Sequence, residues 1–223
     1  KYDKLNYDML KEIWGFTACV FLGMIVDMLY WATDKVLIGA LIGSVAVAVY
    51  NIGGVFTSMV NSMSSAISNV FSSRITTMVV KDQPIEKLSE LLIRIGRIQY
   101  LVIAFIISGY IVFGKAFIHF WSGDAYMEAY YIALYTMIPL AIPLIQNVAY
   151  NTILAQKKHK FRSIIYAIIA VVNVISTYMA IPKYGIIGAA VCTAIAYVIG
   201  NGIIMNIYYY KVTKLDIPKF WLN

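Results

Sequence analysis

The 223-residue chain is strongly apolar: 61% of its residues are hydrophobic, 13% are charged, and its mean hydropathy is +0.75. Soluble domains carry about 25% charged residues, so this composition excludes a soluble globular domain, and it also excludes a disordered or collagen-like chain. A disulfide-stabilised secreted module is excluded because the two cysteines, Cys19 and Cys192, both lie in apolar segments. The sequence therefore predicts an all-α polytopic membrane protein.

Long segments with few charges follow one another along the chain and predict six transmembrane helices. A helix needs about 20 apolar residues to cross a bilayer, whereas a barrel strand needs about ten. We expect one six-helix bundle in residues 13–210, between a cytoplasmic lead-in, residues 1–12, and a cytoplasmic tail, residues 211–223. The expected helices are residues 13–42, 45–72, 93–113, 129–155, 163–181 and 186–210.

The distribution of positive charge predicts how the chain is oriented. Lys35, Lys115 and Lys183 fall on one predicted side of the membrane, and every other lysine and arginine falls on the opposite side. Lysine and arginine accumulate in cytoplasmic loops, so we expect both termini to be cytoplasmic. The net charge of +7 then reflects topology and requires no nucleic-acid partner.

The first expected helix carries acidic residues where lipid would surround it. Asp27 lies well inside the span, where an ionisable side chain is costly and by default faces a cavity or a partner. Trp31 and Asp34 follow at i+4 and i+7 on the same face, with Lys35 beside them. This face is suited to a cation, a proton or a sugar. In the alternative interpretation, Asp34 only caps the membrane interface beside Lys35.

The second expected helix is polar without being charged. Its amides and hydroxyls recur at helical spacing, so they share one face. That face is either the wall of a translocation cavity or a tightly packed interface, because small and hydroxylated residues also let membrane helices approach closely. The amides favour the cavity. The cavity candidates are Asn51, Ser58, Asn61 and Ser62, in a stripe that continues through Ser65, Asn69 and Ser72.

The fourth expected helix contains Pro139 and Pro143, each of which removes a backbone donor and crowds the preceding turn. Two prolines four residues apart predict a bent or locally opened helix, which is either a hinge of a moving transporter or a static kink. Asn147 follows the bend and joins the cavity candidates.

Other chemistry is poorly supported by the sequence. Arg74, Arg94 and Arg97 could hold phosphate through their forked guanidinium groups, or could simply anchor the helices at the cytoplasmic interface. No Ser/His/Asp set, HExxH motif or glycine-rich phosphate loop occurs, and the histidines lack partners at metal-ligand spacing. We therefore expect neither catalytic residues nor a metal site, and the protein is not expected to be an enzyme.

Three segments resemble bacterial polysaccharide exporters. They are DMLYWATDKVLIGALIGSVAVAVYNIG (residues 27–53), FIHFWSGDAY (residues 117–126) and IPKYGIIGAAVCTAIAYVIG (residues 181–200). On these motifs the chain resembles the O-antigen and capsule repeat-unit flippases. These flippases belong to the multidrug/oligosaccharidyl-lipid/polysaccharide exporter superfamily, which also contains the MATE-type multidrug extruders.

The resemblance implies a substrate, a location and a partner. The substrate would be an oligosaccharide on a polyprenyl diphosphate, flipped from the inner to the outer leaflet of the bacterial cytoplasmic membrane by alternating access. Family members contain two six-helix bundles, so the resemblance implies that this chain is one half, more similar to the C-terminal half, with the other half as its partner. No cofactor is implied other than a coupling proton or sodium ion.

Two other functions remain open from the residues. The same fold could form a cation-coupled multidrug extruder, with Asp27 as the titrating carboxylate, although the polar stripe predicts a less apolar cavity than such a protein needs. A membrane-bound glycan polymerase or lipid transferase would require a sizeable outer loop with paired charges, and the predicted outer loops are short.

Overall fold

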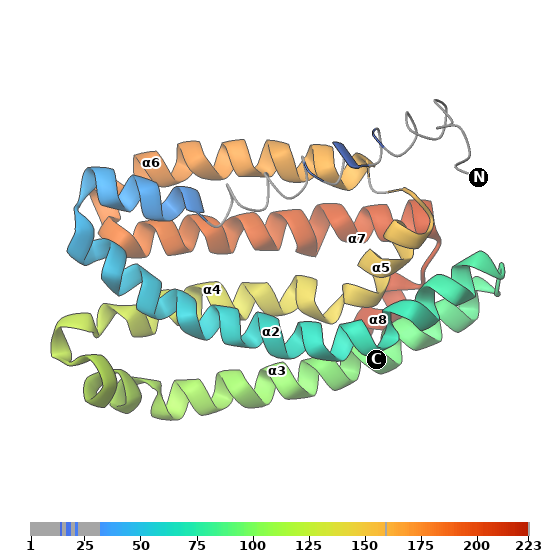
Figure 1. Ribbon diagram of the computed structural model, residues 1–223, viewed down its shortest axis with the longest axis horizontal. Coiled ribbons are helices and arrows are strands. Elements are labelled where there is room, and N and C mark those ends of the chain that lie inside the picture. Colours follow the sequence, from blue (N-terminus) through green and yellow to red (C-terminus); the bar gives the residue numbers. More distant parts are fainter. Residues whose placement is uncertain (1–13, 15–16, 19–20, 22–31, 159, 223) are drawn as a thin grey trace, which may run out of the picture.

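A computed structural model describes residues 14, 17–18, 21, 32–158 and 160–222 of the chain (Figure 1). Within these residues the regular structure is entirely helical, and residues 32–41 are helical. The further elements are α2 (Ser44–Val80), α3 (Ile85–Ser122), η1 (Asp124–Tyr126), α4 (Glu128–Ile145), α5 (Asn147–Ala155), α6 (Lys160–Tyr197), η2 (Val198–Ile204), α7 (Met205–Tyr208), η3 (Tyr209–Thr213) and α8 (Ile217–Leu222).

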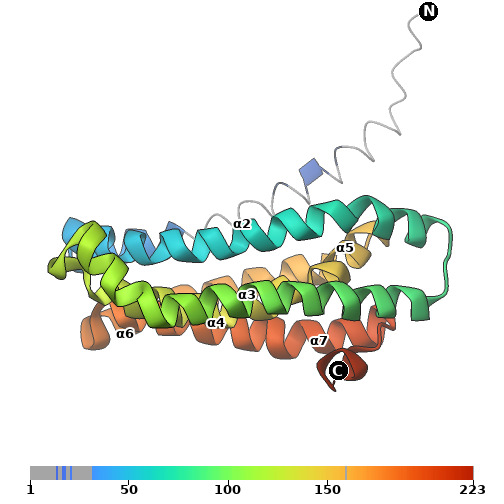
Figure 2. The same ribbon diagram turned by 90° about the horizontal axis from the view of Figure 1, so that it is seen from below.

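The long helices lie side by side in an elongated bundle (Figures 1 and 2). α4 is central, because it packs against α2, α3 and α6. α6 reverses direction at Gly185, whose backbone leaves the helical region with φ 61° and ψ −150°. The part of α6 after Gly185 continues through η2, α7 and η3, antiparallel to the part before it (Figure 1).

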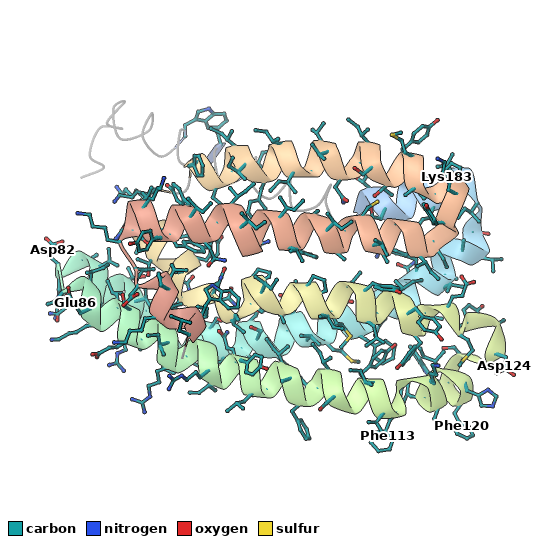
Figure 3. The ribbon with its side chains drawn as sticks, turned by 180° about the vertical axis from the view of Figure 1, so that it is seen from behind. Asp82, Glu86, Phe113, Phe120, Asp124 and Lys183 are labelled. Atoms are coloured by element: carbon teal, nitrogen blue, oxygen red, sulfur yellow. The ribbon has the colours of Figure 1, made fainter. Side chains whose placement is uncertain are left out.

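The two ends of the bundle differ in their turns. At the end that we call the glycine end, the chain turns at Gly43, Gly123 and Gly185, all with positive φ, where glycine lacks the Cβ that would clash. At the opposite end, the lysine end, the positive-φ residues are Asp82, Lys157 and Lys214. Figure 3 shows Asp82 and Glu86 at the lysine end, and Asp124 and Lys183 at the glycine end.

The bundle is that of a membrane protein. Four helical segments in the described part of the chain are long and apolar enough to cross a bilayer: Ser44–Val80, Ile85–Ser122, Asp124–Ile145 and Phe161–Thr213. The last of these doubles back at Gly185. Large apolar side chains cover the outside of the bundle, and Phe113 and Phe120 point outward from α3 (Figure 3). The expected count of six helices remains a prediction, because most of residues 13–31 lie outside the described residues.

Several helices differ in length from the sequence-based expectation. α2 continues past residue 72 to Val80, and α3 begins at Ile85 rather than 93 and ends at Ser122 rather than 113. The apolar pattern stops where charges begin, but helical hydrogen bonding continues into water without needing apolar side chains. The expected tail also contains a short helix, α8, which packs on α3.

The expected helix over residues 129–155 is divided in the structure. α4 contains both Pro139 and Pro143 and ends at Ile145, and α5 begins at Asn147. Gln146 lies between them with φ −99° and ψ 11°, and its N–H donates to the Pro143 carbonyl at 3.2 Å. The expected bend is therefore a break in the helix, three residues beyond the second proline.

Candidate functional site

Asp34 is buried in the bundle, with 3% of its surface exposed, and it connects three parts of the chain through hydroxyl groups. Its Oδ2 accepts hydrogen bonds from the Tyr50 hydroxyl on α2, at 2.8 Å, and from Thr193 Oγ1, at 2.7 Å. Its Oδ1 accepts a longer bond from Thr177 Oγ1, at 3.5 Å. Thr177 and Thr193 lie on opposite sides of the Gly185 reversal, so a single carboxylate ties residues 32–41 to α2 and to both arms of α6.

An oxygen-rich layer surrounds this carboxylate. Asn173, one turn before Thr177, donates through Nδ2 to Thr193 Oγ1 at 3.4 Å, and its own buried Oδ1 has no hydrogen-bond partner among the described residues. A buried carbonyl oxygen without a donor is costly, so this oxygen is able to accept a hydrogen bond from a further donor. Carboxylate, hydroxyl and amide oxygens are therefore grouped at this level of the bundle.

A cavity of about 290 Å³ opens beside Asp34, between α2, α4 and the second arm of α6. We call it the Asp34 cavity. Its α2 wall carries Asn51 and Ser58, two of the residues that the sequence singled out, and Lys35 borders it as well. Thr57 and Thr136 hydrogen-bond to each other across α2 and α4 at 2.7 Å and form part of its lining.

A second cavity, of about 260 Å³, lies nearer the lysine end, and we call it the Arg162 cavity. The guanidinium of Arg162 lies 4.3 Å from the centre of the Tyr150 ring and 4.2 Å from that of Tyr166. The lining combines amides, aromatic rings and this one charged side chain: Asn61, Leu140, Pro143, Leu144, Asn147, Tyr150, Arg162, Tyr166, Tyr197, Asn201 and Tyr209.

Tyr197, a buried side chain, borders both cavities. The helix changes there from α to π geometry, which extends over Val198–Ile204 and contains Asn201. Such π-helical turns are rare and occur frequently at functional sites. Together the cavities follow the polar face of α2 from Asn51, beside the Asp34 cavity, to Asn61, beside the Arg162 cavity.

Other polar residues of α2 serve packing. Gln99 of α3 donates through Nε2 to Ser64 Oγ at 3.1 Å and to Ser68 Oγ at 2.6 Å, and Asn147 Nδ2 donates to Ser64 Oγ at 3.3 Å. Both interpretations of the polar helix therefore apply, to different faces: one face lines the cavities, and the face with Ser64 and Ser68 packs against α3 and α5.

The break between α4 and α5 is connected to the tail by side-chain amides. Asn206 Oδ1 accepts hydrogen bonds from Gln146 Nε2, at 2.7 Å, and from the Trp221 indole of α8, at 3.1 Å. Its Nδ2 donates to the π-helical carbonyls of Asn201 and Gly202. Asn206 therefore joins the break, the π-helical segment and the tail at one point.

The remaining sequence candidates lie elsewhere. Asp27 and Trp31 lie outside the described residues. Ser62 is exposed on α2 and borders neither cavity, and the three arginines proposed for phosphate are exposed away from both cavities. Those arginines are Arg74 on α2 and, on α3, Arg94 and Arg97, the last of which borders a groove between α3 and α8.

Sequence reasoning missed the hydroxyl partners of Asp34 and the cation of the Arg162 cavity. Tyr50, Thr177 and Thr193 carry no pattern of their own, because single hydroxyls in apolar helices are also ordinary packing residues. In the sequence, Arg162 stands out only as one of the cations on the predicted cytoplasmic side. The signal that could have identified it is the pair Tyr150 and Tyr166, since tyrosine and arginine four residues apart on one helix lie on the same side.

The described residues contain no group of three or more histidine, cysteine, aspartate or glutamate side chains placed to hold a metal ion. Comparison with known proteins gives one finding. A family model described as "Polysaccharide biosynthesis protein" matches residues 3–131, which is more than half of the chain. No curated protein and no solved structure matches the sequence.

Proposed function

This chain belongs to the polysaccharide biosynthesis protein family, and on that basis we propose that it flips a polyprenyl-diphosphate-linked oligosaccharide from the inner to the outer leaflet. Family membership indicates a role in polysaccharide synthesis or export. The observation that supports flipping is the set of amides and hydroxyls that the two cavities along α2 carry among apolar side chains. Glycan hydroxyls entering a membrane must exchange water for other hydrogen-bonding groups, since each unsatisfied group costs about 1–3 kcal/mol. Amides and hydroxyls from several helices line both cavities.

The proposal includes a second helical bundle. Asn51, Ser58, Ser62 and Asn69 are exposed on α2, and polar side chains on a membrane helix require protein or a water-filled cavity beside them. A facing bundle would complete the cavity walls. Rocking of the two bundles against each other would then expose the substrate to one leaflet at a time, as alternating access requires.

The proposed orientation follows the charges. Among the described residues, every lysine and arginine except Lys35, Lys115 and Lys183 lies in the half of the bundle nearer the lysine end. Under the positive-inside rule the lysine end faces the cytoplasm. The substrate would then enter near the Arg162 cavity and leave near the Asp34 cavity, in a bacterial cytoplasmic membrane.

Asp34 and the hydroxyls around it offer a way to couple transport to an ion gradient. We propose that a proton or sodium ion binds at Asp34, among the hydroxyls of Tyr50, Thr177 and Thr193. An ion that binds one state of the transporter better than another shifts the population toward that state. Because this carboxylate joins α2 to both arms of α6, its neutralisation can bias how these helices pack.

The proposal is tested by replacing Asn51 and Asn61 with leucine in the full-length protein and measuring export of repeat units by cells that depend on it. Leucine removes one hydrogen-bonding group from each cavity wall, so we expect export to fall at least about tenfold while the protein still inserts. Ser108→Leu is the control, because Ser108 is an exposed hydroxyl on α3 that borders neither cavity. Parental export in the double variant would contradict the proposal.

A multidrug extruder is the second candidate, and the observation that favours it is the buried carboxylate of Asp34, which has no cation among its hydrogen-bond partners in the described part of the chain. An extruder with an apolar cavity would tolerate the asparagine replacements. Drug resistance that survives the double replacement, together with unchanged surface polysaccharide, would favour this candidate over the flippase.

A further inference from the structure

We propose that the groove between α3 and α8 binds an anionic phospholipid of the surrounding bilayer, whose phosphate Arg97 holds. The groove has a volume of about 200 Å³ and lies toward the lysine end. Its lining residues are Gly96, Arg97, Tyr100, Ile145, Phe220 and Trp221. The inference goes beyond the proposed function, because this lipid is not transported and the groove shares no lining residue with either cavity.

The groove exists because α8 packs closely on α3 (Figures 1 and 3). A Cβ at Gly96 would lie 2.5 Å from Phe220 Cε2 and 2.9 Å from the Ile145 carbonyl oxygen, so Phe220 rests on backbone there. The Trp221 indole donates to Asn206 Oδ1 at 3.1 Å, which holds the other aromatic side chain of α8 in place. One wall of the groove is therefore formed before a ligand binds, and preformed walls lower the entropy cost of binding.

Arg97 gives the groove its positive charge. Its side chain is exposed, no described residue forms an ion pair with it, and no acidic residue is among the described lining. A guanidinium binds two phosphate oxygens at once through its planar fork. Basic pockets between membrane helices on the cytoplasmic side bind anionic headgroups in this way. The groove therefore attracts a phosphate and offers no described carboxylate that would compete for the arginine.

The depth of Arg97 along α3 fits the position of a lipid headgroup. From Ser122, the last residue of α3, to Arg97 the helix rises about 37 Å. The hydrocarbon core of a bilayer is about 30 Å thick, so a boundary at the glycine end places Arg97 in the headgroup layer at the lysine end. Tyr100 and Trp221 are exposed beside it, and tyrosine and tryptophan are enriched at this level of a membrane.

The outer face of α3 continues from the groove as an apolar surface. Leu101 and Phe105 follow Arg97 at i+4 and i+8, so the three side chains lie along one side of the helix. Leu101 is 67% exposed and Phe105 is 79% exposed. An acyl chain along this surface would lead to a phosphate at Arg97. A free phosphate ion would match the arginine alone, whereas a phospholipid matches both the arginine and the apolar face.

The experiment measures binding of phosphatidylglycerol and phosphatidylcholine to the purified full-length protein in detergent by native mass spectrometry. The two lipids carry the same acyl chains, but only phosphatidylglycerol is anionic. We expect phosphatidylglycerol to bind at least about tenfold more tightly, and Arg97→Gln to remove this preference. Arg94→Gln is the matched control, because Arg94 is an exposed arginine one turn away on the same helix that does not border the groove.

Two further measurements test whether the lipid occupies the groove. Trp221→Ala removes an aromatic wall and no charge, so phosphatidylglycerol affinity should fall at least about threefold. Polyprenyl diphosphate is added as a competitor at a concentration equal to that of phosphatidylglycerol, and bound phosphatidylglycerol should persist. Its displacement would show that the groove takes the transported carrier, which would overturn the assignment to a resident lipid.

Each remaining outcome also decides the proposal. If the preference persists in Arg97→Gln, the lipid binds elsewhere; if both arginine variants lose it equally, overall charge attracts the lipid and the groove does not. Equal binding of the two lipids by the parent protein would overturn the site as well. If Arg97→Gln does not fold, Arg97→Lys replaces it: the ammonium keeps the charge but loses the fork, so affinity should fall at least about threefold. Unchanged affinity in that variant would contradict the assignment.

Discussion

Asp34 links more helical segments than a side chain of its size usually does. Three hydroxyls, from Tyr50, Thr177 and Thr193, donate to one buried carboxylate, and they come from α2 and from both arms of α6. Hydrogen bonds to a charged acceptor contribute about 1.5–3 kcal/mol each, roughly twice the contribution of neutral ones. A change of charge at this position therefore alters the packing of several helices at once.

The first prediction concerns this residue. Asp34→Asn keeps the size of the side chain but removes its charge and one acceptor oxygen, so we expect transport to fall at least about tenfold while membrane insertion is retained. Export by cells that depend on the protein gives the readout. Asp124→Asn is the control, since Asp124 is an exposed acid at the glycine end, paired with His119. Full export in Asp34→Asn would show that the carboxylate has only a structural role.

At the scale of the elements, close contact between α2 and α4 determines where the Asp34 cavity lies. A Cβ at Gly53 would lie 2.8 Å from Ile132 Cγ2 and 3.0 Å from the Ala129 carbonyl oxygen, so the helices touch there through backbone. At the neighbouring Gly54, which lines the cavity, a Cβ would meet nothing within 4 Å. One face of α2 is therefore packed against α4, and the adjacent face is open.

The second prediction uses this matched pair of glycines. Gly53→Ala forces the helices apart, and overpacking of this kind costs about 1–3 kcal/mol, so we expect a lower thermal unfolding midpoint. Gly54→Ala gains up to about 1 kcal/mol of helix propensity without a clash, so its midpoint should equal or exceed that of the parent protein. The unfolding temperatures of both variants in the same detergent give the comparison. Equal destabilisation of the two would contradict the helix contact described above.

At the scale of the whole molecule, the two ends of the bundle differ in chemistry. The glycine end reverses direction through residues without Cβ atoms, whereas the lysine end collects the cations and the tail helix α8. The tail is attached there by the Trp221 indole, which reaches Asn206, and by the Asp216 N–H, which donates to Ser89 Oγ at 3.1 Å. This asymmetry is what a membrane protein of fixed orientation requires.

The third prediction tests that orientation. Single cysteines at Ser122, near the glycine end, and at Lys158, near the lysine end, are introduced after Cys19 and Cys192 have been replaced by serine. A membrane-impermeant thiol reagent added to intact cells should label position 122 and leave position 158 unlabelled until the cells are opened. Labelling of both positions from outside would contradict the topology, and labelling of position 158 alone would invert it.

The helices and their membrane character follow from local physics, which is why the sequence alone predicted them. Apolar length determines which segments can span a bilayer, and the helical spacing of amides and hydroxyls predicted the polar face of α2. Proline removes a backbone donor, so an opened helix near Pro143 was expected as well. The predicted positions of the helix ends were less accurate. The apolar pattern stops where a helix leaves the lipid, whereas its backbone hydrogen bonds continue into water.

The composition of the two cavities was decided only by the tertiary structure. Asn51, Ser58 and Asn61 were recognisable because several amides and hydroxyls recur along one helix, and Asn147 because it follows the bend that the two prolines predict. Arg162 and the hydroxyl partners of Asp34 were not, because their meaning depends on which distant residues they meet. Thr193 comes 159 residues after Asp34 and still donates to it at 2.7 Å. Helix packing and the reversal at Gly185 create that contact, and no periodicity along the chain encodes it.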